Sequence, residues 1–131
     1  MFVDASAMVA ILVEESDAAA LTKRLEQAVE RCTSPIALYE AVVGVARVCN
    51  VPIRAAEMIL DRFLERATVR VVPITAEIGH GALTAFERYG RGRHPAALTM
   101  GDCFAYACAR ALDVPILFKG DDFPLTDITV A

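Results

Sequence analysis

The sequence predicts an α/β fold in which helices cover both faces of a central, mainly parallel sheet, so that the chain forms three layers. Short apolar segments of strand length alternate with longer segments whose apolar residues recur at helical spacing. One or two helices separate successive strands, and parallel strands require connections of this kind. At 131 residues the chain has the length of one domain, so residues 1–131 are expected to form a single unit.

The expected elements at the start of the chain follow from apolar spacing and from the residues that interrupt it. Residues 1–3 form a short apolar strand that ends at Asp4, and the apolar residues of segment 5–12 continue at helical spacing. Asp17 is suited to capping a second helix. The apolar residues 36–38 then predict a second strand.

The middle of the chain predicts two helices and a strand. A helix over about 39–49 would have Glu40 in its first turn, and a second helix follows over about 53–67. The β-branched residues of segment 69–72 predict a strand, because such side chains favour extended backbone. Pro73 ends this strand.

The last third of the chain predicts two helices and two strands. A helix capped by Thr75 is expected to end at about Tyr89, and the Gly- and Arg-rich segment 90–95 predicts a flexible loop. Residues 100–102 introduce a helix that continues to about Leu112. The apolar segments 115–118 and 128–130 predict the final strands.

Composition and charge exclude several classes of protein. The apolar fraction is 56%, but charged residues interrupt each apolar stretch before it is long enough to span a membrane, and no signal peptide is apparent. We therefore expect a cytoplasmic protein without membrane contact. The net charge of −4 argues against nucleic-acid binding through a broadly basic surface. The cysteines lack the spacing of zinc or redox sites and are expected to be buried free thiols.

Five carboxylates fall at predicted strand ends, turns or first helical turns: Asp4, Glu40, Asp102, Asp121 and Asp122. Each one alone is explained by helix capping or by turn formation. The predicted fold, however, brings four chain segments to one edge of the sheet, and each segment supplies an acid there. Clustered carboxylates are unfavourable unless a cation binds them, and oxygen ligands suit Mg²⁺ or Mn²⁺. Such ions support hydrolysis of phosphodiesters.

Several segments quoted together identify a family. They are Phe2-Val3-Asp4-Ala5-Ser6-Ala7, Glu40, Gly101-Asp102-Cys103-Phe104-Ala105-Tyr106-Ala107, Phe118-Lys119-Gly120-Asp121-Asp122-Phe123 and Thr126-Asp127-Ile128, with the loop Gly90-Arg91-Gly92-Arg93-His94-Pro95-Ala96 before the third acid. In this order and spacing they resemble the VapC-type PIN-domain toxins over the whole chain. The resemblance implies a PIN-like fold for residues 1–131.

The resemblance also assigns roles to individual residues. The first three acids of the family correspond to Asp4, Glu40 and Asp102. The fourth corresponds best to Asp121, and the adjacent Asp122 stays an alternative. Ser6 corresponds to the small polar residue that supports the first acid.

An activity and a set of partners are implied in the same way. The family consists of Mg²⁺- or Mn²⁺-dependent endoribonucleases that cleave structured RNA, often tRNA or rRNA, as toxins of type II toxin–antitoxin systems. A homodimer and a cognate VapB-like antitoxin in a hetero-oligomer are also implied. The tail of the antitoxin is expected to place a basic residue in the acidic pocket.

Three basic residues are candidates for contact with the RNA backbone. Lys119 adjoins the acid pair, and Arg91 and Arg93 form with His94 a compact basic cluster. A solvent-exposed turn and a solubilising loop explain the same residues equally well.

One alternative function stays open, and two others fit poorly. A phosphoaspartate phosphatase would need a second acid where Ser6 stands, and a receiver domain would need an acidic neighbour of Asp4. The open alternative is a catalytically silent PIN-like module that binds a basic partner peptide. The presence of all four acids argues against it.

Overall fold

Four short parallel strands form the centre of the computed structural model, which describes residues 1–131. The sheet has the order β3-β2-β1-β4. Its strands are β1 (Phe2–Val3), β2 (Arg31–Thr33), β3 (Val69–Val71) and β4 (Ile116–Leu117), each parallel to its neighbours. The predicted α/β fold with a parallel sheet is confirmed.

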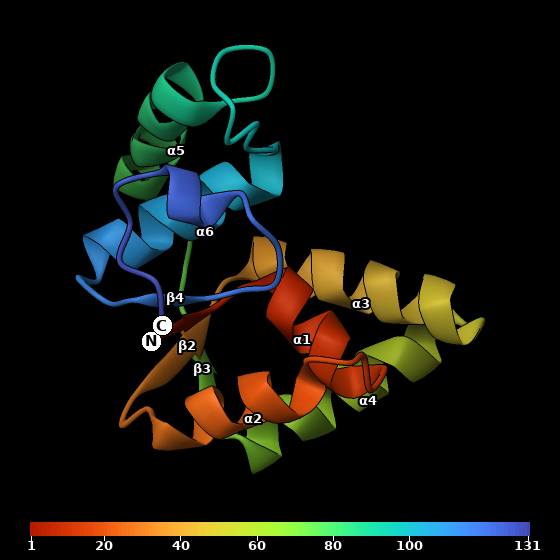
Figure 1. Ribbon diagram of the computed structural model, residues 1–131. Helices are drawn as coiled ribbons and strands as arrows, with labels where there is room; N and C mark the ends of the chain where they lie inside the picture. Colours follow the sequence, from red (N-terminus) through yellow and green to blue (C-terminus); the bar gives the residue numbers. More distant parts are fainter.

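Six helices surround this sheet. They are α1 (Ala5–Leu12), α2 (Ala18–Gln27), α3 (Pro35–Cys49), α4 (Ile53–Arg66), α5 (Ala76–Tyr89) and α6 (Met100–Ala111), and a short 3₁₀ helix, η1 (Phe123–Leu125), follows β4. Figure 1 shows α5 and α6 on one side of the sheet and α2 and α4 on the other. Because α1 and α3 begin directly after β1 and β2, their first turns lie at the carboxyl edge of the sheet.

The prediction of a strand at 36–38 is wrong, because these residues belong to α3. Ser34 caps this helix, and its hydroxyl accepts a hydrogen bond from the N–H of Ala37 (3.2 Å). Pro35 occupies the first turn, where its missing N–H has no cost. The strand in this region is the preceding segment, Arg31–Thr33.

The strand β2 was not predicted because it begins with a charged residue. The guanidinium group of Arg31 donates hydrogen bonds to the carbonyl oxygens of Leu25 (2.7 Å), Glu26 (3.0 Å) and Ala67 (2.7 Å). These carbonyl groups lie at or near the ends of α2 and α4, where helices leave acceptors unsatisfied. Arg31, at the amino end of this inner strand, therefore joins two helices, and no apolar pattern marks it.

Residues 128–130 were also predicted to form a strand, and they form only one bridge to β4. Two backbone hydrogen bonds with Ile116 attach this segment to β4, and side chains attach the residue before it. The hydroxyl of Tyr106 donates a hydrogen bond to Asp127 Oδ1 (2.5 Å), and Arg88 forms an ion pair with the same carboxylate (3.2 Å). Burial and the bond to Asp127 raise the pKa of Tyr106 to about 12.

The cysteines and the apolar helices were both subjects of expectations from composition. Cys32, Cys103 and Cys108 are buried free thiols, as expected, whereas Cys49 is exposed at the end of α3. No helix by itself has the length and apolar composition of a membrane span, and only α3 and α4 together, bent by 120°, pass that test.

Candidate active site

Asp4 lies at the carboxyl end of β1, where its side chain caps α1. Its Oδ2 atom accepts hydrogen bonds from the N–H (2.9 Å) and the hydroxyl (2.5 Å) of Ser6. The Ser6 oxygen in turn accepts a hydrogen bond from the N–H of Lys119 (3.0 Å), which follows β4. Burial raises the pKa of Asp4, hydrogen bonds to Ser6 lower it, and the charge of Asp102 raises it further, so that the net shift is upward. Ser6 thus links the first acid to the ends of two neighbouring strands.

Asp102 lies in the first turn of α6, as predicted, and forms a reciprocal capping pair with Thr99. The hydroxyl (2.6 Å) and the N–H (2.7 Å) of Thr99 both donate hydrogen bonds to Asp102 Oδ2. The Thr99 oxygen also accepts a hydrogen bond from the N–H of Asp102 (3.4 Å). The second carboxylate oxygen, Oδ1, takes no part in these bonds.

Glu40 is half-buried and has no polar partner, since it accepts no hydrogen bond and forms no ion pair. It lies in the second turn of α3 and not in the predicted first turn, because the helix begins at Pro35. Burial raises the pKa of Glu40, and the charges of Asp4 and Asp102 raise it further. Three carboxylates, from the end of β1, from α3 and from α6, therefore lie within electrostatic range of one another.

Gly101 provides the space for Glu40 at the start of α6. A Cβ atom at residue 101 would collide with both carboxylate oxygens of Glu40. Gly101 is buried, and its φ angle is not positive. Glycine is therefore needed here because it has no side chain, and not because the backbone adopts a conformation that only glycine favours. The carboxylate of Glu40 therefore packs against the backbone next to Asp102.

The candidates for the fourth acid, Asp121 and Asp122, lie in the exposed turn after β4. Burial and the charges of Asp102 and Asp121 raise the pKa of Asp122, while the charge of Arg91 lowers it. Asp122 thus interacts with the third acid directly, and Asp121 acts on Asp122. Asp121, which corresponds best to the fourth acid by resemblance, and Asp122 both stay candidates for this position.

The three basic candidates differ in their surroundings. The ammonium group of Lys119 pairs with Glu15 and lies 3.2 Å from Asp17, at the connection between α1 and α2. Arg91 is close enough to the acidic turn to lower the pKa of an aspartate there. Arg93 lies over an aromatic ring of α5, 5.5 Å from its centroid. Only Arg91 therefore has a direct electrostatic interaction with the acidic group.

The acidic group fits a divalent cation by its donor chemistry. As the side chains lie, no three His, Cys, Asp or Glu residues are arranged to hold a metal ion. All the donors are carboxylate oxygens, which suit Mg²⁺ or Mn²⁺. Asp4 and Asp102 are each anchored through Oδ2, which leaves Oδ1 outside those bonds, and Glu40 has no bond to break before binding. A cation would also relieve the mutual repulsion of the three acids.

Glu40→Gln is expected to stabilise the metal-free protein at neutral pH by a few degrees in Tm. The folded state raises the pKa of Glu40 above its ordinary value of 4.5, so the ionised side chain destabilises the fold. The stability of the wild type rises as pH falls through the raised pKa, and the difference between variant and wild type should vanish below about pH 4.5. Thermal unfolding in EDTA at pH 7 and pH 4 tests this. A variant less stable than the wild type at pH 7 contradicts it.

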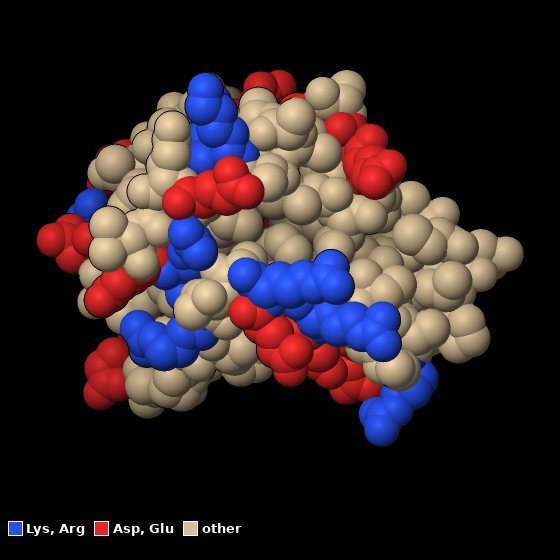
Figure 2. Space-filling view, turned by 90° about the horizontal axis from the view of Figure 1, so that it is seen from below, with Lys and Arg blue, Asp and Glu red and all other residues tan.

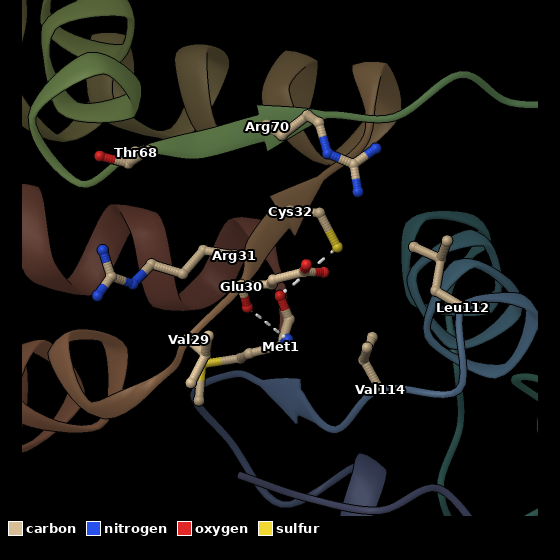
Figure 3. Close-up of a pocket in the computed structure, with 9 residues that line it drawn as sticks. All are labelled: Met1, Val29, Glu30, Arg31, Cys32, Thr68, Arg70, Leu112 and Val114. Carbon is tan, nitrogen blue, oxygen red and sulfur yellow. Dashed lines mark hydrogen bonds between the residues drawn. The ribbon is translucent and has the colours of Figure 1, made fainter.

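A cavity of about 330 Å³ lies at the other end of the sheet and includes none of the five acids. Figure 3 shows around it Met1, which precedes β1, together with Cys32 of β2 and Arg70 of β3. The amino group of Met1 donates a hydrogen bond to the carbonyl oxygen of Glu30 (2.8 Å). Parallel sheets bind ligands at the carboxyl ends of their strands, so the acidic group is the better candidate site.

The surface seen from below the view of Figure 1 shows no continuous basic area. In Figure 2, Lys and Arg side chains lie beside Asp and Glu side chains across this face. This mixture agrees with the net charge of −4. Attraction of a polyanion to this face by a uniform positive field is therefore excluded.

Thr99 was not identified as a site residue from the sequence. Gly101 was named only as part of a family motif and was given no role of its own. Thr99 and Asp102 have the spacing of a capping box ahead of an apolar segment, and this pattern could have identified the pair. No local pattern could have identified the contact of Gly101 with Glu40, because the two residues lie on different helices.

Comparisons with known proteins agree with this geometry. The PIN-domain family model matches residues 1–128. A VapC ribonuclease of Rhizobium meliloti is 38% identical, with 97% of this chain and 98% of the relative covered. A ribonuclease VapC of Mycolicibacterium smegmatis is 39% identical, with 98% and 97% covered. The crystal structure of Mycobacterium tuberculosis VapC20, a toxin that cleaves the sarcin–ricin loop, superposes with a TM-score of 0.77 at 22% identity, covering 99% of this chain and 97% of that one. The chain therefore belongs to the PIN-domain family, together with the VapC ribonucleases that it resembles over its whole length.

Proposed function

We propose that this chain is a divalent-metal-dependent endoribonuclease and the toxin of a VapBC toxin–antitoxin system. The observation that supports this most directly is the group of carboxylates at the carboxyl edge of the sheet, in which Glu40 has no polar partner. Family membership supports the reaction class, because the relatives are named ribonucleases. A single PIN domain, residues 1–131, would provide the whole site.

Mg²⁺ or Mn²⁺ is the cofactor in this proposal. Asp4, Glu40 and Asp102 are its proposed ligands, and Asp121 or Asp122 completes the group. Such an ion lowers the pKa of a bound water and neutralises charge on the scissile phosphate. Ser6 supports this chemistry by orienting Asp4 through two hydrogen bonds.

The RNA backbone is proposed to contact the basic residues beside the acids. Arg91 and Arg93 belong to the loop between α5 and α6, and Lys119 follows β4. Lys119 would exchange its carboxylate partners, Glu15 and Asp17, for a phosphate oxygen. Since the protein is acidic as a whole, the attraction must be local.

The proposed substrate is a structured RNA in the cytoplasm, with tRNA and rRNA as candidates. The name of VapC20 describes cleavage of the sarcin–ricin loop, and only the class of structured RNA is extended to this chain. We also propose a homodimer that a VapB-like antitoxin inhibits in a hetero-oligomer. A basic antitoxin residue placed among the acids would replace the charge of the metal ion.

Removal of divalent ions is expected to abolish RNA cleavage, because carboxylates alone repel the phosphate that is attacked. The measurement is cleavage of total tRNA and rRNA by the purified chain in EDTA, followed by addition of excess Mg²⁺ or Mn²⁺. Cleavage should return with either ion and not with an equal concentration of Na⁺. Activity that EDTA leaves unchanged would overturn the metal-dependent assignment, and no cleavage under any of these conditions would favour the binding module.

A further inference from the structure

The three hydrogen bonds between Thr99 and Asp102 distinguish α6 from the other helices. Ser34 and Thr75, the caps of α3 and α5, each accept a hydrogen bond from a backbone N–H, but neither forms the reciprocal capping box that Thr99 forms with Asp102. Thr99 also accepts such a bond, but its hydroxyl in addition donates to the Asp102 carboxylate. Helix capping by itself does not need the second bond, because acceptance by the cap oxygen already satisfies the free N–H.

The same oxygen of Asp102 also accepts the N–H of Thr99, so that two donors lie within 2.7 Å of Oδ2. Two donors on one carboxylate oxygen restrict rotation about both side-chain bonds. The oxygen that stays outside these bonds is Oδ1. Asp102 is also the acid whose charge acts on Asp4, Glu40 and Asp122, so its orientation affects the whole group.

Asp4, which follows β1, is bonded in a closely similar way. Its Oδ2 accepts one backbone N–H and one hydroxyl, both from Ser6, at 2.9 and 2.5 Å. Each of the two acids is therefore held through one carboxylate oxygen by a nearby hydroxyl group. Ser6 lies two positions after Asp4, and Thr99 lies three positions before Asp102. Glu40, in contrast, has no such anchor, and its carboxylate packs against Gly101.

We propose that Thr99 is a positioning residue that orients Asp102 as a ligand through its hydroxyl group, and that it is more than a cap of α6. This inference rests on the proposed function, since it concerns how the acidic group binds a divalent ion. Residues that orient metal ligands typically contribute about 10- to 100-fold to metal affinity or activity.

The test is Mn²⁺ binding to the purified full chain, measured by calorimetry without RNA, with RNA cleavage as a second readout. Thr99→Val removes the hydroxyl at nearly constant shape and is expected to weaken Mn²⁺ binding by about 10-fold. Thr99→Ser keeps the hydroxyl and should stay within about two-fold of the wild type. Thr75→Val is the matched control, because it makes the same change at the cap of α5, away from the acids.

Thr99→Gly separates positioning from folding, because glycine at a helix cap costs only a few tenths of a kcal/mol. This variant should fold like the wild type and still bind Mn²⁺ about 10-fold more weakly. Wild-type affinity in both Thr99→Val and Thr99→Gly, or equal weakening in Thr75→Val, overturns the proposed role of Thr99. Asp102→Asn reports separately on the proposed function: if it binds Mn²⁺ like the wild type, the acidic group is not a metal site.

Discussion

Asp102→Asn is expected to lose RNA cleavage by more than about 100-fold while the fold is retained. The change removes one anionic oxygen from the acid that interacts with Asp4, Glu40 and Asp122. Loss of a residue that merely supports a ligand typically costs about 10- to 100-fold, so loss of the ligand itself should cost more. The side-chain oxygen of Asn can still accept both hydrogen bonds from Thr99, and α6 should therefore keep its cap.

The measurement is kcat/KM on a defined structured RNA at saturating Mg²⁺ or Mn²⁺, together with circular dichroism and Tm. Asp113→Asn is the matched control, since Asp113 is exposed just after α6 and has the positive φ that Asn tolerates. The control should cleave RNA like the wild type. If Asp102→Asn is equally active, the acidic group is not the site of cleavage.

The fold class was predictable because apolar periodicity and chain punctuation agree over most of the sequence. The helix capped by Thr75 has the predicted bounds, and the strand and helix around Asp4 follow the expected pattern. The error at 36–38 arose where two signals conflict. Three apolar residues favour a strand, but Ser34 and Pro35 immediately before them provide a cap and a first turn, and these local signals prevail.

The strand β2 and the final bridge could not be predicted from periodicity, because long-range contacts determine them. Arg31 occupies a strand because its guanidinium group finds three carbonyl acceptors on two helices. The segment near Asp127 is attached by Tyr106, by Arg88 and by two backbone hydrogen bonds with Ile116, and not by a longer ladder. Neither the carbonyl acceptors of Arg31 nor the side chains that bind Asp127 are next to those residues in sequence.

The members of the candidate site were predictable as a set, and their arrangement was not. Strand ends and first helical turns placed Asp4, Glu40 and Asp102 at one edge of the sheet, and the resemblance assigned roles to them. The sequence did not reveal that Glu40 would lack a polar partner, or that the charge of Asp102 would raise the pKa of Asp122. Both features depend on the distances between side chains that belong to different helices and turns.

Gly101→Ala is expected to lower kcat/KM by about 10- to 100-fold, the range typical of changes that displace a metal ligand without removing it. The new methyl group would occupy the position of the Glu40 carboxylate, so this carboxylate must shift from its place beside residue 101. The backbone of residue 101 does not require glycine, and alanine favours a helix by about 0.5–1 kcal/mol over glycine. Activity should therefore fall without a matching fall in stability.

Gly79→Ala provides the control for this substitution, because a Cβ atom there meets no atom within 4 Å in α5. It should raise Tm by a few degrees and leave cleavage unchanged. A double-mutant cycle then identifies the cause. If Gly101→Ala acts by displacing Glu40, it should add little to the loss already produced by Glu40→Gln, since residues that act together are not additive. Independent, multiplicative losses would instead mean that Gly101→Ala disturbs Asp102 or its cap, and that the packing of Glu40 against residue 101 is not what maintains the acidic group.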